Sequence, residues 1–596
     1  MKEFKEKIVE EVVNDFIKRR EERLKLEKQW ELNLKFLEGE QYYSLLSNGS
    51  IIEKEKNFSY EKREVYNHIL PIIERRLAKF SQIKPLFSVR PTNDEEREIN
   101  NAKIAEKVLS STFNKLEVEK SVLQATKWSE TLGTAFYKVI WQHNSGKEIG
   151  KTEDKKIFEG EVKISVISPF EIFPDSLFHQ EIEDCTSLIH AKAMPIFEVE
   201  KLFGKKLKKI VTRFDEEEGF ITVIEKYERP TENYPLGRLI TVAGDELLFY
   251  GDLPYENGDE GQRVFPFVKQ TAGIIPGNFF GTSIIERLIP VQRAFNAIKN
   301  RKYEFLNRLS SGIMTVEDGA IDTDDLETEG LMPGKVIVYR QGMNAPSMLK
   351  EEPIPTEFSL EEERLLTEFV SISGINDVMN SVLSPKVTSA TALEVLARQE
   401  NEKLLLEAEN IRNCCLILAK MVLRLYRQFI KGVRIMKEVE TDAENKIFYV
   451  DKSVMQSDDV YIDSENEMLF TQSQKKEMLF KLYESGLLTN GNGVLSTVVK
   501  EKMLKLLGYK NLSSENSVIS LHEQKADAEN KKIAKEKIEV DLIDNDEIHL
   551  TEHTKYILCE YENLTKEQKE RVFYHIQKHK ENQKKENEYA RTRKEN

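Results

Sequence analysis

The sequence predicts an α+β fold that is mainly α-helical. Long segments place apolar residues three and four positions apart, as amphipathic helices do, and shorter segments between them alternate apolar and polar residues, as half-buried strands do. The chain has 596 residues, of which 40% are hydrophobic and 32% are charged. This length and composition are typical of a folded, charge-rich protein with roughly three to five domains.

The charge and the cysteines argue against several classes of protein. The formal net charge of −15 argues against tight DNA binding, which draws on basic side chains, although DNA could still pass such a protein without sticking. No stretch is long and apolar enough to span a membrane, and the charged start of the chain is unlike a signal peptide, so we expect a cytoplasmic protein. The four cysteines form no C-x-x-C pair, which argues against disulfides and a cysteine zinc site.

Residues 1–60 are predicted to form an N-terminal helical arm, with the helix over about 1–45. We expect its apolar stripe to pack on its own domain or on a neighbouring subunit, and a helix lying on a membrane surface is the alternative. The stripe consists of Phe4, Ile8, Val12, Phe16 and Ile17.

Residues 61–282 are predicted to form a domain in which helices precede strands. Helical spacing predicts one helix from about 67 to 84 and another over 94–131. β-rich or alternating sequence then predicts strands at 135–141, 160–167, 188–193, 220–228 and 239–250, the last with a Gly244-Asp245 turn.

Two further helices, 283–309 and 357–375, are predicted to bracket a small insert. Ser283 can cap the first helix, and Gly374 marks the end of the second. The first helix is unusually basic, and its cations either form ion pairs between helices or contact DNA phosphates or an acidic neighbouring subunit. Its basic residues include Arg287, Arg293, Lys299, Arg301 and Lys302.

The insert, residues 310–356, is predicted to be a small α/β module with strands around 312–316 and 335–339. It also carries an acidic run, for which a solvated acidic face is expected and metal ligands are the alternative. The run includes Asp322, Asp324, Asp325, Glu327 and Glu329.

A loop rich in turn formers, 376–388, separates the bracketing helices from a very long helix. Ser389 or Thr391 can cap this helix, which continues to about residue 431. Strands are predicted again at 446–450 and 460–462. β-rich sequence therefore lies on both sides of the helical block, and we expect one β-containing domain to receive strands from before residue 283 and from after residue 431.

The remaining chain is predicted to be helical. Residues 464–520 contain a pair of helices, and residues 521–596 form a charged helical tail with a break near 541–546. We predict no β-barrel in this tail.

No motif predicts nucleotide hydrolysis. Gly273, Gly277 and Gly281 are evenly spaced, but no Gly-Lys-Ser/Thr follows them, so a phosphate-binding loop is not expected. A role for these glycines in backbone turns is the preferred interpretation.

Histidines gather in the tail. His549 and His553 stand in the H-x-x-E-H pattern of inverted zincins, and His575 and His579 repeat the four-residue spacing. We expect surface or helix-packing histidines, with a structural metal or a catalytic zinc as alternatives. The sequence therefore predicts no catalytic residue, no cofactor and no metal site.

Seven segments resemble the portal proteins of tailed bacteriophages, particularly those of the short-tailed lineage. Centrally they are FPFV at 265–268, IPGNFFGTSIIE at 275–286, PVQRAFN at 290–296, GINDV at 374–378 and TSATAL at 388–393. Upstream they are FLEGEQY at 36–42 and VISPFEIFPD at 166–175. None is catalytic, but their order and spacing extend the resemblance over about residues 25–580.

The resemblance implies a portal fold with a β-containing wing, a helical stem, a small α/β clip, a long spanning helix and a helical crown. The implied parts are the first part of the wing, 61–282; the stem helices, 283–309 and 357–375; the clip, 310–356; the tunnel loop, 376–388; the long helix and second part of the wing, 389–463; and the crown, 464–520.

The resemblance also implies a structural role without turnover. Portal subunits form a ring, usually a dodecamer, at one capsid vertex, through which DNA is packaged and ejected. The implied partners are double-stranded DNA held weakly and non-specifically, terminase, the major capsid and scaffolding proteins and a tail adaptor, with no membrane. The implied location is the virion, and the host cytoplasm during assembly.

The tunnel loop is the part that the resemblance places nearest to DNA. Here residues 380–386 replace the small-residue turn that is usual in the family, and Lys386 is the candidate for transient phosphate contacts. The loop residues expected to face the channel are Ser381, Ser384, Lys386 and Thr388.

Two other functions are compatible with the sequence. The first is an oligomeric helical scaffold or adaptor through which no DNA passes. The second is a metal hydrolase built on the H-x-x-E-H segment of the tail.

Overall fold

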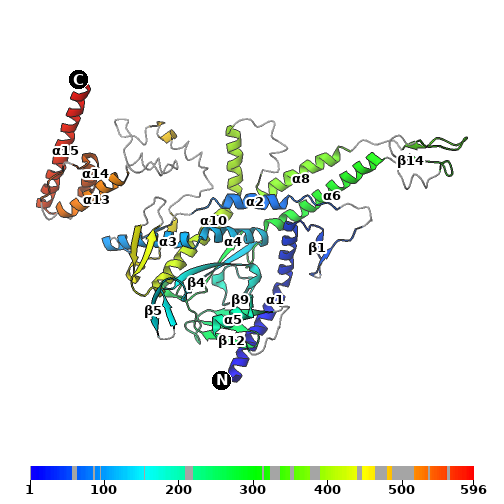
Figure 1. The fold of residues 1–596 in the computed structure, drawn as a ribbon, viewed down its shortest axis with the longest axis horizontal. Coiled ribbons are helices and arrows are strands. Elements are labelled where there is room, and N and C mark those ends of the chain that lie inside the picture. The colour runs from blue at the N-terminus through cyan, green and yellow to red at the C-terminus, as the bar shows by residue number, and fades with distance from the viewer. Residues whose placement is uncertain are drawn as a thin grey trace. The chain divides into compact units, whose positions relative to one another are not determined.

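A computed structural model gives the fold, and Figure 1 shows it as a ribbon. The chain divides into two compact units, 1–469 and 470–596. About 51% of it is helix and 19% strand, which confirms a mainly helical α+β protein. The structure describes residues 2–47, 49–56, 63–84, 87–93, 95–152, 155–207, 219–311, 314–321, 336–348, 355–375, 390–438, 446–462, 480–482, 484–485, 516–533, 537–541, 543–559 and 564–595.

A five-stranded antiparallel sheet forms one layer of the first unit. Its strand order is β12-β11-β10-β9-β8, so strands that follow one another along the chain also lie side by side in the sheet. The predicted Gly244-Asp245 turn joins β11 to β12, as expected. The strands are β8 (Ile172–Pro174), β9 (Ser187–Pro195), β10 (Phe220–Glu228), β11 (Arg238–Ala243) and β12 (Glu246–Gly251).

Helix α1 (Lys2–Glu38) packs on this sheet, which confirms that the N-terminal helix docks on its own domain. Phe16 contacts Phe173 of β8 edge-to-face, with ring centroids 4.8 Å apart. Phe4 and Ile17 were expected in the same stripe but are exposed. The buried stripe of α1 consists of Ile8, Val9, Val12, Val13 and Phe16, each contributing about 1.5–3 kcal/mol by burial.

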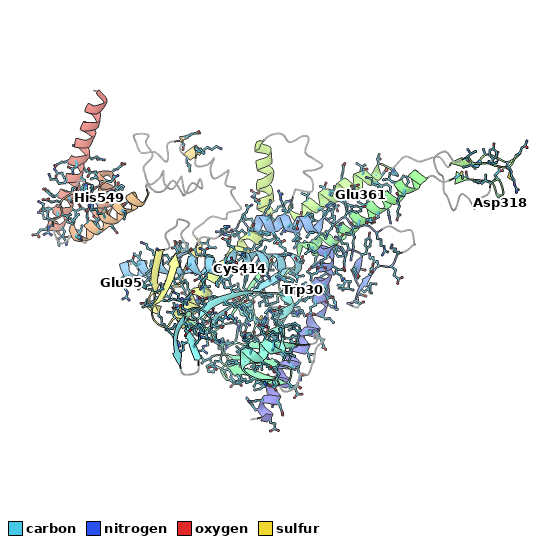
Figure 2. All side chains as sticks on the ribbon, in the orientation of Figure 1. Trp30, Glu95, Asp318, Glu361, Cys414 and His549 are labelled. Carbon is cyan, nitrogen blue, oxygen red and sulfur yellow. The ribbon has the colours of Figure 1, made fainter. Side chains whose placement is uncertain are left out.

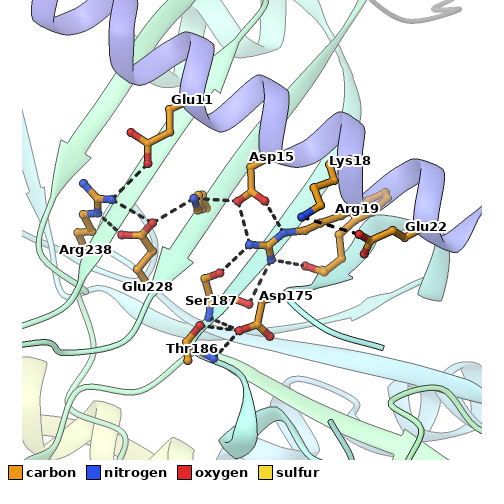
Figure 3. Close-up of polar contacts among 12 residues, drawn as sticks. Glu11, Asp15, Lys18, Arg19, Glu22, Asp175, Thr186, Ser187, Glu228 and Arg238 are labelled. Carbon is orange, nitrogen blue, oxygen red and sulfur yellow. Dashed lines mark hydrogen bonds and ion pairs between the residues drawn. The ribbon is translucent and has the colours of Figure 1, made fainter. Parts of the chain in front are cut away.

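Buried charges fix α1 in position along the sheet (Figure 3). Asp15 accepts two hydrogen bonds from Arg19 and forms an ion pair with Lys226 of β10, at 2.8 Å between Oδ2 and Nζ. Arg19 in turn donates to the carbonyl oxygens of Phe173 and Ser187, both at 3.2 Å. The helix is therefore held to three strands by directional contacts as well as by its apolar stripe.

A second, three-stranded sheet has the order β13-β4-β7 and lies in the largest hydrophobic core of the first unit. Two helices precede it in the segment 94–131, which the sequence predicts to be helical. That prediction is confirmed, and Glu117, with a φ of 49°, divides the segment into the two helices. The elements are α3 (Glu96–Lys115), α4 (Val118–Leu132), β4 (Thr134–Gln142), β7 (Glu161–Ile167) and β13 (Phe267–Thr271).

The same core receives strands from after the long helix. β18 (Val460–Ile462) pairs antiparallel with β3 (Phe87–Val89), with Val460 opposite Val89. β16 (Arg434–Glu438) and β17 (Lys446–Val450) form a hairpin whose Met436 and Val450 are buried in this core. This confirms the expectation that one domain takes strands from both sides of the helical block.

Close backbone contact explains the glycines that precede α6. A Cβ atom on Gly281 would overlap the side chain of Thr271 and the carbonyl oxygen of Gly273. Gly133, at a φ of 89°, packs against Gly281 in the same way. The backbone interpretation of this glycine-rich segment is therefore confirmed for Gly281.

Three long helices form the helical block: α6 (Ile284–Ser311), α8 (Glu357–Ser373) and α10 (Ala390–Phe429). The Ser283 hydroxyl accepts a hydrogen bond from the amide of Ile285 at 2.9 Å, so the predicted cap is confirmed. Gly374 ends α8 at a φ of 73°, also as predicted.

The insert differs from its prediction. β14 (Met314–Thr315) pairs with β15 (Ser347–Met348), and residues 336–340 are not a strand. The expectation of a strand over 335–339 is therefore wrong for the described residues of that segment. Smaller elements of the first unit are α2 (Ile69–Phe80), α5 (Ile196–Phe203), β1 (Tyr43–Leu45), β2 (Ile51–Glu53), β5 (Glu148–Thr152) and β6 (Lys155–Phe158).

The second unit contains three described helices, α13 (Asn516–Ile533), α14 (Asp546–Cys559) and α15 (Lys566–Glu595). Their apolar core is small and centres on Ile533, Ile557, Val572 and Ile576. Among the helices that the structure describes, none has the length and apolarity to cross a bilayer.

Candidate functional site

The candidate site is the helix pair α6 and α8 with the adjoining end of α10. Phe295 packs against Phe369, and Phe305 against Phe358, with ring centroids 6.1 and 6.2 Å apart. Because the later residue of α6 meets the earlier residue of α8, the two helices run antiparallel. The chain therefore runs along α6 to the insert and returns along α8.

Two of the predicted basic residues pair with one carboxylate across the helices. Lys299 forms an ion pair with Glu362 of α8, and Lys302 binds the other oxygen of the same carboxylate at 3.1 Å. Burial by itself would raise the pKa of Glu362, but hydrogen bonds from both lysines hold that pKa below its usual value. The ion-pair interpretation of the basic helix therefore holds for these two residues.

Arg293 is committed to contacts within the subunit. Its guanidinium donates to the carbonyl oxygen of Tyr43 at 2.7 Å and lies 5.1 Å from the ring centroid of Phe36. Burial lowers the pKa of Arg293 below its usual value. This residue joins α6 to the end of α1 and the strand that follows, so it is not available to a ligand in solution.

Arg287 and Arg301 differ from the other three. Both are exposed, and neither forms an ion pair with any residue that the structure describes. Arg287 lies near enough to Glu407 of α10 to lower the pKa of that carboxyl, whereas Arg301 faces solvent on the half of α6 that leads to the insert. Of the five predicted cations, Arg287 and Arg301 are therefore the two whose side chains are exposed and have no ion-pair partner in the described part of the chain.

A ladder of buried amides on α6 was missed by sequence reasoning. Gln292, Asn296 and Asn300 are 0–5% exposed and stand four residues apart on one face of the helix. Their side-chain oxygens accept hydrogen bonds from the backbone amides of His68, Tyr66 and Glu64, at 3.0, 3.1 and 3.1 Å.

The amide ladder also donates. Gln292 donates to the carbonyl oxygen of Tyr66 at 2.8 Å, Asn300 to that of Glu64 at 2.9 Å, and Asn296 to the Gln41 side chain at 2.7 Å. The side chains of the ladder thus form hydrogen bonds with the backbone of every second residue in the segment 64–68. A neighbouring β-strand would pair with the segment in the same alternating pattern. The signal in the sequence was three amides at four-residue spacing, but their partner lies more than two hundred positions away.

A buried charge cluster lies where α8 ends and the chain leaves for the predicted tunnel loop. Arg76 of α2 binds Glu130 of α4 at 2.6 Å, forms an ion pair with Glu407 of α10, and donates to the carbonyl oxygen of Ser373 at 2.7 Å. Arg76 and Glu130 are both almost fully buried. Four helices are therefore tied together by one guanidinium.

This cluster holds one carboxylate more than its single arginine can neutralise. Burial and the neighbouring Glu130 raise the pKa of Glu407 to about 7, although Arg76 opposes the shift. Glu407 therefore exchanges a proton near neutral pH, at the base of the loop that follows α8.

Two sets of predicted site residues lie outside the described residues. They are the tunnel-loop set, Ser381, Ser384, Lys386 and Thr388, and the acidic set of the insert, Asp322, Asp324, Asp325, Glu327 and Glu329. Both sets stay predictions.

The tail histidines are buried between helices, so of the two expected placements the helix-packing one is confirmed and the surface one is wrong. His549, His553, His575 and His579 are each at most 1% exposed. Among the described residues, these histidines, with Glu529 and Asp544, form the groups that could hold a metal ion.

The described residues thus contain an antiparallel pair of long helices, α6 and α8, on either side of a small insert, and a 40-residue helix, α10, further along the chain. Residues 237–468 match the family described as Phage P22-like portal protein. The match confirms the resemblance of this chain to phage portal proteins, a structural and non-enzymatic family. No curated protein matches the chain.

Proposed function

We propose that this chain is the subunit of a phage portal, a ring at one capsid vertex that serves as the channel for DNA packaging and ejection. The observation that carries the proposal is the family match over 237–468, because it spans the helix pair, the insert, the loop and the long helix together. The family forms homo-oligomeric rings, and a dodecamer is the number we expect.

The distribution of charge supports loose passage of DNA. Each phosphate held by a fixed cation adds affinity that translocation would have to overcome. Three of the five basic residues of α6 are bound within the subunit, and the chain carries a net charge of −15. We therefore expect duplex DNA to bind weakly and to dissociate at modest salt, and a nanomolar, salt-resistant complex would contradict this.

The parts are assigned by their place in the chain. The helices 283–309 and 357–375 are the stem, and the insert 310–356 is the clip that docks terminase and later the tail adaptor. The loop 376–388 lines the channel, with Lys386 as its cation. The wing consists of 61–282 and, with the long helix, of 389–463, and the crown of 464–520. The ring has the major capsid protein and the scaffolding protein as further partners, in the virion and during assembly in the host cytoplasm.

Electron microscopy of the purified chain tests this proposal. We expect rings with an axial hole, and native mass spectrometry gives their subunit number. Filaments, compact monomers or closed assemblies without a hole would contradict DNA passage and favour a scaffold or adaptor. For the hydrolase alternative, normal folding and ring assembly of a His549→Ala, His553→Ala double variant, together with no zinc in the purified chain, would remove it.

A further inference from the structure

The four buried histidines of the second unit come from two helices and meet carboxylates from the helices around them. His549 and His553 lie on α14, and His575 and His579 on α15. Glu529 of α13 is 7% exposed and completes the group. Figure 2 labels His549 among the side chains of this group of helices.

Three of the histidines have one ring nitrogen fixed by a hydrogen-bond acceptor. Nδ1 of His553 is 2.6 Å from Oδ1 of Asn530, Nδ1 of His575 is 3.1 Å from the carbonyl oxygen of Ile538, and Nδ1 of His579 is 2.6 Å from Oδ1 of Asp546. An acceptor at Nδ1 selects the tautomer that carries its proton there. In each ring the Nε2 atom is left with a lone pair, as in histidines that bind metals.

These three Nε2 atoms and one carboxylate oxygen converge. Nε2 of His575 lies 3.2 Å from Nε2 of His579. Oε2 of Glu529 lies 3.6 Å from Nε2 of His553 and 3.7 Å from Nε2 of His575. Four ligands of a tetrahedral zinc ion, bound at about 2.0–2.1 Å, stand about 3.3 Å from one another.

The converging atoms have no adequate partner among the described residues. Oε2 of Glu529 and Nε2 of His553 are buried without a hydrogen bond. A buried polar atom left in this way costs about 1–3 kcal/mol. One shared proton between His575 and His579 would satisfy that pair alone and would leave Glu529 and His553 unpaired.

We propose that Glu529, His553, His575 and His579 bind one divalent transition-metal ion, with Zn²⁺ as the expected ion, which joins α13, α14 and α15. Imidazole nitrogens with one carboxylate in a tetrahedral set suit zinc, whereas Mg²⁺ and Ca²⁺ require more oxygen ligands. This replaces the sequence-based expectation that the tail binds no metal.

The site is structural. Four protein ligands close a tetrahedral zinc ion, whereas a catalytic zinc keeps one position open for water. The small apolar core of the second unit gives a reason for such a cross-link, because small domains often need one.

A second grouping, Glu529, Asp544, His549 and His579, competes for the same ion. Asp544 is already bound by Lys525, at 2.6 Å between Oδ1 and Nζ, and lies 3.7 Å from Nε2 of His549. The first grouping is therefore the better ligand set. His549 Nδ1 lies 3.1 Å from Oε2 of Glu529 but forms no hydrogen bond with it.

Titration of the full chain with metal tests the proposal. After treatment with a chelator, the protein is titrated with Co²⁺ and then with Zn²⁺. We expect about one Co²⁺ per chain, the strong visible absorption of a tetrahedral cobalt site, and its loss on addition of about one Zn²⁺. No saturable binding, or the weak spectrum of six-coordinate cobalt, would overturn the proposal.

Variants locate the ion. His579→Ala is expected to abolish the cobalt spectrum, and Asp546→Asn to weaken binding about 10- to 100-fold, because it disturbs the acceptor behind His579. Glu552→Gln and His522→Ala are matched controls on the same helices and should bind as the unchanged chain does. Loss of the spectrum in both controls would overturn the ligand assignment, and the titration of the unchanged chain decides the matter if His579→Ala does not fold.

Discussion

Two buried sites, one around Arg23 in the first unit and one around Glu529 in the second, satisfy their ionisable side chains to different degrees. In the first unit, Arg23 is 1% exposed, yet each of its three nitrogens donates a hydrogen bond, among them one to the carbonyl oxygen of Pro169 at 2.8 Å. In the second unit, Nε2 atoms of histidines face one another and a carboxylate oxygen that accepts no hydrogen bond. A satisfied buried network fixes a fold, whereas an unsatisfied convergent one indicates a missing ligand.

The largest expected effect comes from removing the cation of a satisfied network. Arg76→Met should lower the free energy of unfolding of the first unit by about 3–5 kcal/mol, because Glu130 and Glu407 would remain buried without a counter-ion. Urea denaturation followed by tryptophan fluorescence measures this unit alone, since Trp30, Trp128 and Trp141 all lie in it.

The control for that variant is Lys84→Met, which breaks the exposed ion pair with Glu119 and should cost no more than about 1 kcal/mol. If the two variants unfolded at the same urea concentration, the charge cluster would not be the stabilising network described here.

The proton held by Glu407 gives the same cluster a pH dependence. Its pKa rises from 4.5 to about 7 on folding, so the folded chain binds this proton more tightly than the unfolded chain. The contribution of this proton to the free energy of unfolding is fully present below about pH 4.5. It is lost as the pH rises through about 7, and the loss is at most about 3 kcal/mol.

This contribution is measured by comparing the urea midpoints of the unchanged chain and of Glu407→Gln. The comparison runs from pH 5 to pH 8, because the effect develops roughly between the pKa values of the unfolded and folded chain. The unchanged chain should lose more stability across that range than the variant does. The half-exposed Glu409 provides the control, since Glu409→Gln should keep the pH slope of the unchanged chain. Equal slopes for all three proteins would refute the assignment.

The amide ladder should contribute less than the charge cluster. Asn296→Ala removes an acceptor from the Tyr66 amide and a donor to Gln41, and we expect a loss of about 2 kcal/mol. Hydrogen exchange of the segment 64–68 should accelerate in the variant, while exchange in β9 and β10 should not change. Unaltered protection of 64–68 would show that other contacts hold this segment.

The smallest expected effect concerns the free cation Arg301. Arg301→Ala should change the urea midpoint by no more than about 0.5 kcal/mol, as exposed substitutions usually do. Under the portal proposal it should also lower the slope of log DNA affinity against log salt by about 0.9. An unchanged slope would mean that Arg301 does not contact phosphates, and a large loss of stability would mean that it is not free.

Local signals in the sequence predicted local structure well. Ser283 and Gly374 predicted the bounds of α6 and α8, and the Gly244-Asp245 turn predicted the hairpin of β11 and β12. The break at Glu117 was missed because a non-glycine residue at positive φ leaves no compositional mark.

The site residues were harder to predict because their meaning depends on distant partners. The four-residue spacing of the histidines was visible, but their burial and the acceptors Asn530, Ile538 and Asp546 follow only from the packing of three helices. In the same way, the sequence allowed Lys299 and Lys302 either an ion pair between helices or contact with another molecule, and only the packing of α8 places Glu362 beside them. Spacing predicts which side chains share a face but not what that face meets.

The pairing of β18 with β3 determines when the core of the first unit can be completed during translation. Val89 leaves the ribosome long before its partner Val460 is made, and at about 5–20 residues per second the interval is roughly 20–75 s. Throughout that time the edge of β3 and the apolar faces of α3 and β4 lack the residues that later cover them. Nascent subunits should therefore need a chaperone, or slow synthesis, until the last strand arrives.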